Sequence, residues 1–175
     1  MGSLIAVAAL GASAQLLIQL PPSISVAPIT GQSLVVLLMA RLLPWNWSAA
    51  AIIFYLLLGG LGLPVFSDFS SGTEVLFGKS AGYFFGFIVA AIVIGKMAEK
   101  RGKHFKEFFL EFILGSAIIL FFGALLLLRF MEFESVYLKG VRPFLAGALV
   151  KVLIGSILLT FYYKVSSFLK KIPEN

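Results

Sequence analysis

The sequence predicts an all-α integral membrane protein, and three observations support that fold class. Of its 175 residues, 60% are hydrophobic and 13% are charged, whereas a soluble domain is about half apolar and about a quarter charged. Apolar runs that are long enough, or almost long enough, to form membrane-spanning helices follow one another along the chain. Basic residues gather in the short segments between these runs. Lipid must therefore be part of the solvent that this chain folds in.

The composition excludes several classes of function. There is no cysteine, which excludes disulfides, thiolate metal sites and cysteine nucleophiles. The single histidine, His104, excludes a two-histidine metal site, and we expect neither a metal nor a cofactor. The net charge of +6 does not indicate a nucleic-acid partner, because the basic residues are distributed as membrane-orientation signals. The first residues lack a basic stretch and are interpreted as a retained helix rather than a signal peptide.

Six apolar runs predict six transmembrane helices in one membrane domain covering residues 1–175. Proline or glycine ends the first three runs, at Pro21, Pro44 and Gly62. The fourth run ends at the basic pair before Gly102, and the sixth begins at Pro143, a residue suited to the first turn of a helix. The predicted spans are 4–20, 32–43, 47–61, 80–98, 108–128 and 143–163.

Two of these runs have further features. The second is short, so it is either a tilted helix or a half-helix that lines a cavity. In the fourth, Gly82, Gly86 and Ala90 continue a four-residue repeat of small residues from Gly78. Such a stripe allows neighbouring helices to pack closely.

The basic residues predict that both termini are cytoplasmic. One connection holds Lys96, Lys100, Arg101, Lys103 and Lys106, another holds Arg41, and Lys164, Lys170 and Lys171 lie near the C-terminus. With six spans, all three regions fall on the same side, which the positive-inside rule makes cytoplasmic. We expect a multi-pass protein of the cell (inner) membrane. The alternative is five spans with a re-entrant second run, which would place the N-terminus outside.

Lys151 is the strongest candidate for a ligand contact. It lies about 12 Å into the last predicted span, at 1.5 Å per residue, where a cation is costly unless it meets water, a partner or a ligand. The alternative is a side chain that reaches up to the interface. The small neighbours Gly147, Ala148 and Gly155 favour space for a ligand.

The outward loops supply further candidates. Thr30 and Gln32 begin the second run, where they either cap the helix or hydrogen-bond inside a cavity. Tyr83 begins the fourth run, as an interfacial anchor or as a ring against a ligand. The long loop 62–79 is typical of a functional or lid-like segment, and its candidate ligand contacts are Phe66, Asp68, Ser71, Glu74 and Lys79.

These loops resemble those of the BioY family, the biotin-specific substrate-binding subunits of energy-coupling factor (ECF) transporters. The resemblance is carried by Ala27-Pro28-Ile29-Thr30-Gly31-Gln32-Ser33-Leu34, Gly62-Leu63-Pro64-Val65-Phe66, Gly82-Tyr83 and Pro143-Phe144-Leu145 with Lys151. It implies a six-helix S-component fold that captures biotin at the outer face, with Phe144 among the pocket walls. It also implies partners: a membrane coupling subunit and two cytosolic ATPase subunits. The small residues Ala8 and Ala12 are similar to the docking motif of such subunits, although internal helix packing is the alternative.

The sequence departs from the family pattern next to Lys151. The family commonly has an aspartate three residues before this lysine, where the chain has Ala148. This difference supports the main alternative, a binding subunit of the same fold for a different vitamin. A membrane enzyme is a weaker alternative, because no paired carboxylates or metal ligands lie inside the predicted spans. A structural membrane protein without a ligand is disfavoured by Lys151, and we expect no catalytic residues.

Overall fold

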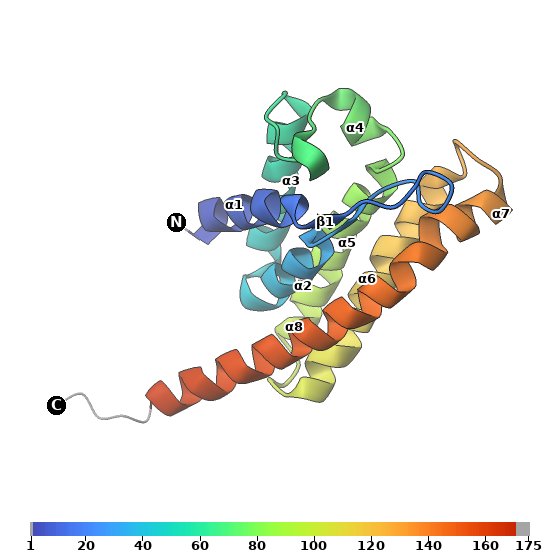
Figure 1. Cartoon of the computed structure of the whole chain (residues 1–175). Helices are drawn as coiled ribbons and strands as arrows, with labels where there is room; N and C mark the ends of the chain where they lie inside the picture. Colours follow the sequence, from blue (N-terminus) through green and yellow to red (C-terminus); the bar gives the residue numbers. More distant parts are fainter. Residues whose placement is uncertain (1, 171–175) are drawn as a thin grey trace.

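The computed structural model describes residues 2–170, with side chains described from Ile5 onward. It consists of long helices joined by loops that contain short helical turns (Figure 1). The long helices are α1 (Gly2–Gln15), α2 (Gln32–Leu42), α3 (Trp45–Gly60), α5 (Ala81–Ala98), α6 (Phe105–Leu127) and α8 (Arg142–Leu169). The short elements are β1 (Leu17–Ile18), β2 (Ile29–Thr30), the 3₁₀ turn η1 (Ser67–Phe69), α4 (Thr73–Phe77), α7 (Phe133–Val136) and the π-helical turn η2 (Tyr137–Val141).

Each long helix lies on one of the six apolar runs predicted from the sequence. Three stretches among the described residues are long and apolar enough to cross a membrane by length and composition: Ala81–Ala98, Phe105–Leu127 and Phe133–Leu169. The helices in the N-terminal part are shorter, at 10–17 residues, but apolar. The helical fold class is confirmed, whereas helix lengths alone leave the number of crossings as a prediction.

Two predicted boundaries were wrong. The first helix was expected to reach residue 20, but it ends at Gln15 because Leu17 and Ile18 pair antiparallel with Thr30 and Ile29. The last helix was expected to end at residue 163, but it continues to Leu169. No proline or glycine occurs between Gly155 and Lys170, so nothing in the sequence breaks the helix there.

The predicted small-residue stripe is a helix–helix contact. The helices α5 and α6 run side by side (Figure 1), and Gly82 and Gly86 of α5 lie against α6. A Cβ atom added to Gly82 would lie 2.3 Å from the carbonyl oxygen of Phe122, and one added to Gly86 would lie 2.8 Å from the Cα of Ile119. Only glycine permits this close approach. Gly78 lies outside α5, so the stripe is shorter than the sequence repeat.

The loops collect at one end of the helix bundle. The connections 61–80 and 128–141 and the segment containing β1 and β2 lie toward that end, and the connection between α5 and α6 lies at the other (Figure 1). Helix α8 crosses the bundle diagonally, and its C-terminal part projects past the other helices. This arrangement separates a loop-covered end from an end that carries most of the basic residues.

Arg41 has a different environment from the one expected. The sequence predicted that it lies in a connection between spans, but it lies within α2 and its side chain is only 2% exposed. Its Nε lies 3.0 Å from Oε2 of Glu111 on α6, whose side chain is 0% exposed. Its two terminal nitrogens donate hydrogen bonds to the carbonyl oxygens of Ala98 and Gly102. Arg41 therefore joins α2, α6 and the connection after α5.

Candidate ligand pocket

A pocket lies under the loop-covered end of the bundle, between α2, α5, α6 and α8. It comprises about 680 Å³ of space not filled by atoms, a volume that includes open solvent. Its lining is Ala27, Pro28, Thr30, Gln32, Ser33, Ser67, Ser80, Tyr83, Phe84, Phe87, Ser116, Ile119, Leu120, Phe144, Ala148 and Lys151. The lining combines apolar and aromatic walls with a few polar groups, as is typical of a small-molecule site.

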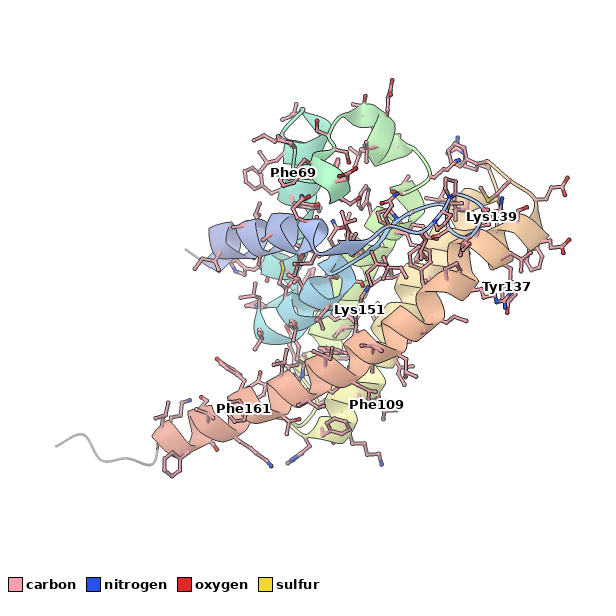
Figure 2. All side chains as sticks on the ribbon, viewed as in Figure 1. Phe69, Phe109, Tyr137, Lys139, Lys151 and Phe161 are labelled. Carbon is pink, nitrogen blue, oxygen red and sulfur yellow. The ribbon has the colours of Figure 1, made fainter. Side chains whose placement is uncertain are left out.

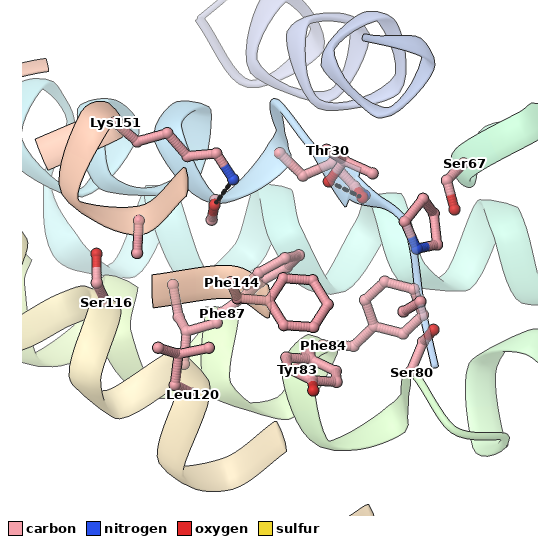
Figure 3. A pocket seen from close by; sticks show the side chains of 16 residues that line it. Thr30, Ser67, Ser80, Tyr83, Phe84, Phe87, Ser116, Leu120, Phe144 and Lys151 are labelled. Atoms are coloured by element: carbon pink, nitrogen blue, oxygen red, sulfur yellow. Dashed lines mark hydrogen bonds between the residues drawn. The ribbon is translucent and has the colours of Figure 1, made fainter. Parts of the chain in front are cut away.

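Lys151 points into this pocket from α8. Its Nζ donates a hydrogen bond to the Ser33 hydroxyl oxygen at 2.9 Å (Figure 3). Within residues 2–170 the only ion pair joins Arg41 and Glu111, so no described carboxylate neutralises Lys151. Its ammonium group retains further donors for an acceptor or an anion in the pocket.

The polar side chains from the start of α2 are held by a chain of hydrogen bonds. Thr30 Oγ1 donates to Gln32 Oε1 at 3.0 Å, and Gln32 Nε2 donates to the Tyr55 hydroxyl at 2.7 Å. That hydroxyl in turn donates to the carbonyl oxygen of Val65 at 2.9 Å. Gln32 is therefore fixed from α3 and from the loop that follows it. A buried amide with partners on both sides cannot rotate freely, so it presents one fixed edge to a ligand.

Aromatic rings form the wall opposite these polar groups. The Tyr83 and Phe144 rings are 5.5 Å apart between centroids, and the Tyr83 hydroxyl donates to the carbonyl oxygen of Gly140. Phe84 also lines the pocket and is stacked on Phe66 at 5.1 Å. Aromatic pairs of this kind contribute about 0.5–1.5 kcal/mol beyond the area they bury, so they stabilise the arrangement of the wall.

Polar groups lie at both ends of the pocket and along the side opposite the aromatic wall. Figure 3 shows Lys151 and Ser116 toward one end and Ser67 and Ser80 toward the other, with Thr30 on one side between them and the labelled aromatic rings on the opposite side. Hydroxyl groups can donate or accept, whereas the lysine can only donate. A fitting ligand is elongated, with polar groups at both ends and an apolar part that lies against the aromatic wall.

Five of the predicted contacts line the pocket together: Thr30, Gln32, Tyr83, Phe144 and Lys151. Four others do not line it: Asp68, Glu74 and Lys79 are exposed, and Ser71 is half-buried in the loop. Nothing in the sequence of this connection distinguishes the two pocket-lining serines, Ser67 and Ser80, from the polar residues that do not line the pocket.

Phe66 was predicted as a pocket wall but lies one layer behind it. Its ring is 0% exposed, packed between Phe84 and the face of α3. A Cβ atom added to Gly59 would lie 2.2 Å from this ring, so the glycine provides the space that the ring fills. Phe66 supports the pocket wall through Phe84 rather than lining the pocket.

Sequence reasoning missed several pocket residues. Ser116 is a single hydroxyl in the otherwise apolar middle of α6, and that isolation is a signal that could have identified it. Phe84 and Phe87 had no such signal, because one phenylalanine in an apolar helix looks like another. Ala148 lines the pocket one turn before Lys151, at the position where the family pattern has an aspartate.

The small residues of α1 lie on the surface. Ala8 and Ala12 are exposed, together with Ile5 at 66% and Leu16 at 74% exposure. The opposite face of α1, with Leu10 and Ala14, is buried in the bundle. Of the two explanations for the small residues, internal packing of this chain is therefore excluded for Ala8 and Ala12.

Comparisons with known proteins agree on one family. The sequence model of the BioY family matches residues 1–168. The biotin transporter BioY of Thermotoga maritima is 35% identical over 132 residues, which cover 75% of this chain and 78% of that protein. The probable biotin transporter BioY of Pyrococcus horikoshii is 33% identical over 133 residues, which cover 76% and 78%.

A solved structure shares the fold. It is the S-component for biotin from an ECF-type ABC transporter, and it superimposes with a TM-score of 0.81 over 93% of this chain and 89% of that one. The two sequences are 20% identical over the match, so this likeness concerns the fold.

Proposed function

The chain belongs to the BioY family, and from this premise and the pocket geometry we propose that it is the S subunit of an ECF importer that binds biotin for uptake. The chain is not an enzyme, because the family consists of transporter subunits. The single observation that carries the choice of ligand is the pocket with polar groups toward two ends and an aromatic wall along one side between them.

The chemistry of biotin fits this distribution of groups. Biotin has a ureido ring at one end, a carboxylate at the other and an apolar thioether ring and chain between them. The aromatic wall of Tyr83, Phe84, Phe87 and Phe144 suits the apolar part. Lys151, which no described carboxylate neutralises, suits an oxygen acceptor at either end.

The topology and partners belong to the same proposal. The chain forms one membrane domain of six spans in the cell (inner) membrane, with both termini cytoplasmic and the pocket open toward the outer face. It docks, through the exposed face of α1 with Ala8 and Ala12, on a membrane coupling subunit that carries two cytosolic ATPases. The exposed position of this face supports a docking role.

Biotin titration of the detergent-purified protein tests the function. Saturable one-to-one binding is expected, and Lys151→Met should weaken it by about 10- to 100-fold, because a hydrogen bond to a charged group contributes about 1.5–3 kcal/mol. Lys164→Met removes a lysine from the same helix at an exposed position outside this pocket and should leave affinity unchanged.

The possible outcomes test the identity of the ligand and the role of Lys151 separately. Equal biotin affinity in wild type and Lys151→Met would refute the role of Lys151 and keep biotin as the ligand. If the folded protein does not bind biotin but binds another vitamin, it is a binding subunit of the same fold for that vitamin, which is the alternative that Ala148 favours. Comparison of biotin with its methyl ester shows which end meets Lys151, since only a carboxylate contact is lost on esterification.

A further inference from the structure

A second candidate site lies at the end of the bundle opposite the biotin pocket, where the C-terminal part of α8 projects past the other helices (Figure 2). An apolar groove runs between α2 and α8 there. Its walls include Leu38 and Leu42 from α2 and Leu158, Phe161, Val165 and Leu169 from α8. Figure 2 shows Phe161 on the projecting part of α8.

A polar cavity adjoins this groove. It lies between α8 and the connection that precedes α6, and its walls include Lys103, His104, Lys164, Ser167 and Tyr163. The groove and the cavity share three lining residues, Tyr162, Ser166 and Lys170. One molecule could therefore occupy both, with an apolar part in the groove and a polar part in the cavity.

The polar cavity carries positive charge without a described counter-charge. Lys103 is directed toward α8, with its Nζ 4.9 Å from the centroid of the Tyr163 ring. Neither Lys103, Lys164 nor Lys170 forms an ion pair with any residue of the range 2–170. An anionic group in the cavity would meet several ammonium donors at once.

The length of α8 places this site at the membrane surface. Its 28 residues extend about 42 Å at 1.5 Å per residue, and the hydrocarbon core is about 30 Å thick. This excess length lets the diagonal α8 cross the core, and the exposed Lys164 and Lys170 favour the headgroup region on the basic side for its last turns. The groove then faces acyl chains and the polar cavity faces headgroups.

We propose that the groove and the polar cavity together bind one anionic glycerophospholipid, with an acyl chain along Leu42, Leu158 and Val165 and the phosphate group at Lys103, Lys164 and Lys170. The positive-inside pattern alone would attract anionic lipid diffusely, with no preference among the basic residues. Binding at a specific site differs from this diffuse attraction, because its affinity depends on the particular residues that line the site. The proposed site is separate from the biotin pocket.

Measuring how much lipid each variant retains distinguishes a specific lipid site from diffuse attraction of anionic lipid. The wild-type protein and two double variants are purified in mild detergent, exposed to phosphatidylglycerol or phosphatidylcholine, and analysed by native mass spectrometry for bound lipid. Lys103→Ala/Lys164→Ala removes two cavity lysines. Lys100→Ala/Lys106→Ala removes the same charge from exposed residues of the same basic segment that line neither cavity.

Wild-type protein should retain one phosphatidylglycerol in preference to phosphatidylcholine. The cavity variant should bind it about 10- to 30-fold more weakly, since each basic residue near an anionic lipid surface contributes about 1 kcal/mol. The control variant should retain it. Unchanged biotin affinity in both variants verifies that they are folded.

Equal losses in the two variants would overturn the proposal in favour of diffuse attraction, and equal binding of phosphatidylcholine would overturn the role of the charge. Val165→Trp tests the groove, because a larger ring should fill it and displace the lipid. If this substitution blocks assembly with the coupling subunit and leaves lipid retention intact, the groove is a protein interface and the proposal is wrong.

Discussion

At the scale of single residues, the buried pair of Arg41 and Glu111 shows how strongly context decides the meaning of a charge. Both side chains are nearly inaccessible, at 2% and 0% exposure. Removing two charges from water is costly, and only good geometry with additional hydrogen bonds offsets that cost. Arg41 donates to the carbonyl oxygens of Ala98 and Gly102, and its Cζ lies 4.9 Å from the centroid of the Phe108 ring. Among the described residues neither carboxylate oxygen of Glu111 accepts a hydrogen bond, so Glu111 depends on the charge of Arg41. The pair therefore fixes the relative position of α2 and α6.

Substituting one residue of the pair should destabilise the fold much more than substituting both. Arg41→Met leaves Glu111 buried without its counter-charge and should lower the free energy of unfolding by about 3–5 kcal/mol. The double variant Arg41→Met/Glu111→Leu leaves no orphaned charge and should recover most of that loss. Thermal unfolding in detergent, monitored as the loss of monodisperse protein, measures the stability of both variants. A double variant as unstable as Arg41→Met would contradict this account.

The sequence identified pocket residues where a polar side chain interrupts an apolar pattern. Lys151 and Gln32 stood out for that reason, and both line the pocket. Arg41 was misinterpreted because a basic residue at the end of an apolar run also fits an orientation signal, and its partner Glu111 is 70 positions away in sequence. Phe66 was placed one layer too far forward, because only packing distinguishes a ring in the wall from a ring behind it.

At the scale of elements, one side chain connects α1 to the loop over the pocket. Gln15, the last residue of α1, donates from Nε2 to the carbonyl oxygen of Phe66 at 2.9 Å. Its Oε1 accepts from the backbone N–H of Phe69 at 3.1 Å. The side-chain amide of Gln15 therefore holds the η1 turn through both its nitrogen and its oxygen. Since Ser67 of this turn lines the pocket, Gln15 positions part of the pocket without lining it.

Releasing this connection should loosen the loop 62–79, which we expect to act as a lid over the ligand. Gln15→Leu removes both hydrogen bonds, and the loop amides should exchange with solvent at least several-fold faster in the absence of biotin. Biotin affinity should fall by a factor of a few, because ordering the freed loop opposes binding. Hydrogen exchange and biotin titration measure the two effects.

Gln19→Leu is the matched control, since Gln19 is exposed and makes no side-chain hydrogen bond within the described residues. It should change neither loop exchange nor affinity. Identical exchange in Gln15→Leu and wild type would show that the two hydrogen bonds do not hold the loop. Exchange that is unaffected by biotin in wild type would reject the lid itself.

Helix positions were easier to predict than helix ends and loop structure. Runs of apolar residues located the long helices to within a few residues, because apolar length is a strong signal in a membrane chain. The end of α1 depends on the pairing of Leu17 with Thr30, a contact between segments that neither segment specifies alone. The turns η1 and α4 rest on tertiary support, and Asp68 in η1 even adopts a positive φ of 57°.

At the scale of the whole molecule, the two ends of the bundle have different compositions. The pocket and the long loops lie at one end, and at the other end the exposed residues Lys100 and Lys103 lie in the connection and Lys106 lies in the first turn of α6. A membrane potential that is negative inside and anionic cytoplasmic lipids both favour the basic end in the cytoplasm. The pocket would then face the outside, where an importer meets its substrate.

The absence of cysteine permits a direct test of this orientation. Single cysteines replace Lys79 in the loop 61–80 and Lys100 in the connection between α5 and α6, and a third is added before Met1. Both lysines are exposed, so either cysteine can react. A membrane-impermeant maleimide should label the Lys79→Cys protein in intact cells, and the other two only after permeabilisation. Labelling of Lys79→Cys and of the N-terminal cysteine in intact cells would instead give five crossings with α2 re-entrant. Labelling of Lys100→Cys in intact cells would reverse the orientation altogether, and would place the biotin pocket on the side from which an importer cannot capture its substrate.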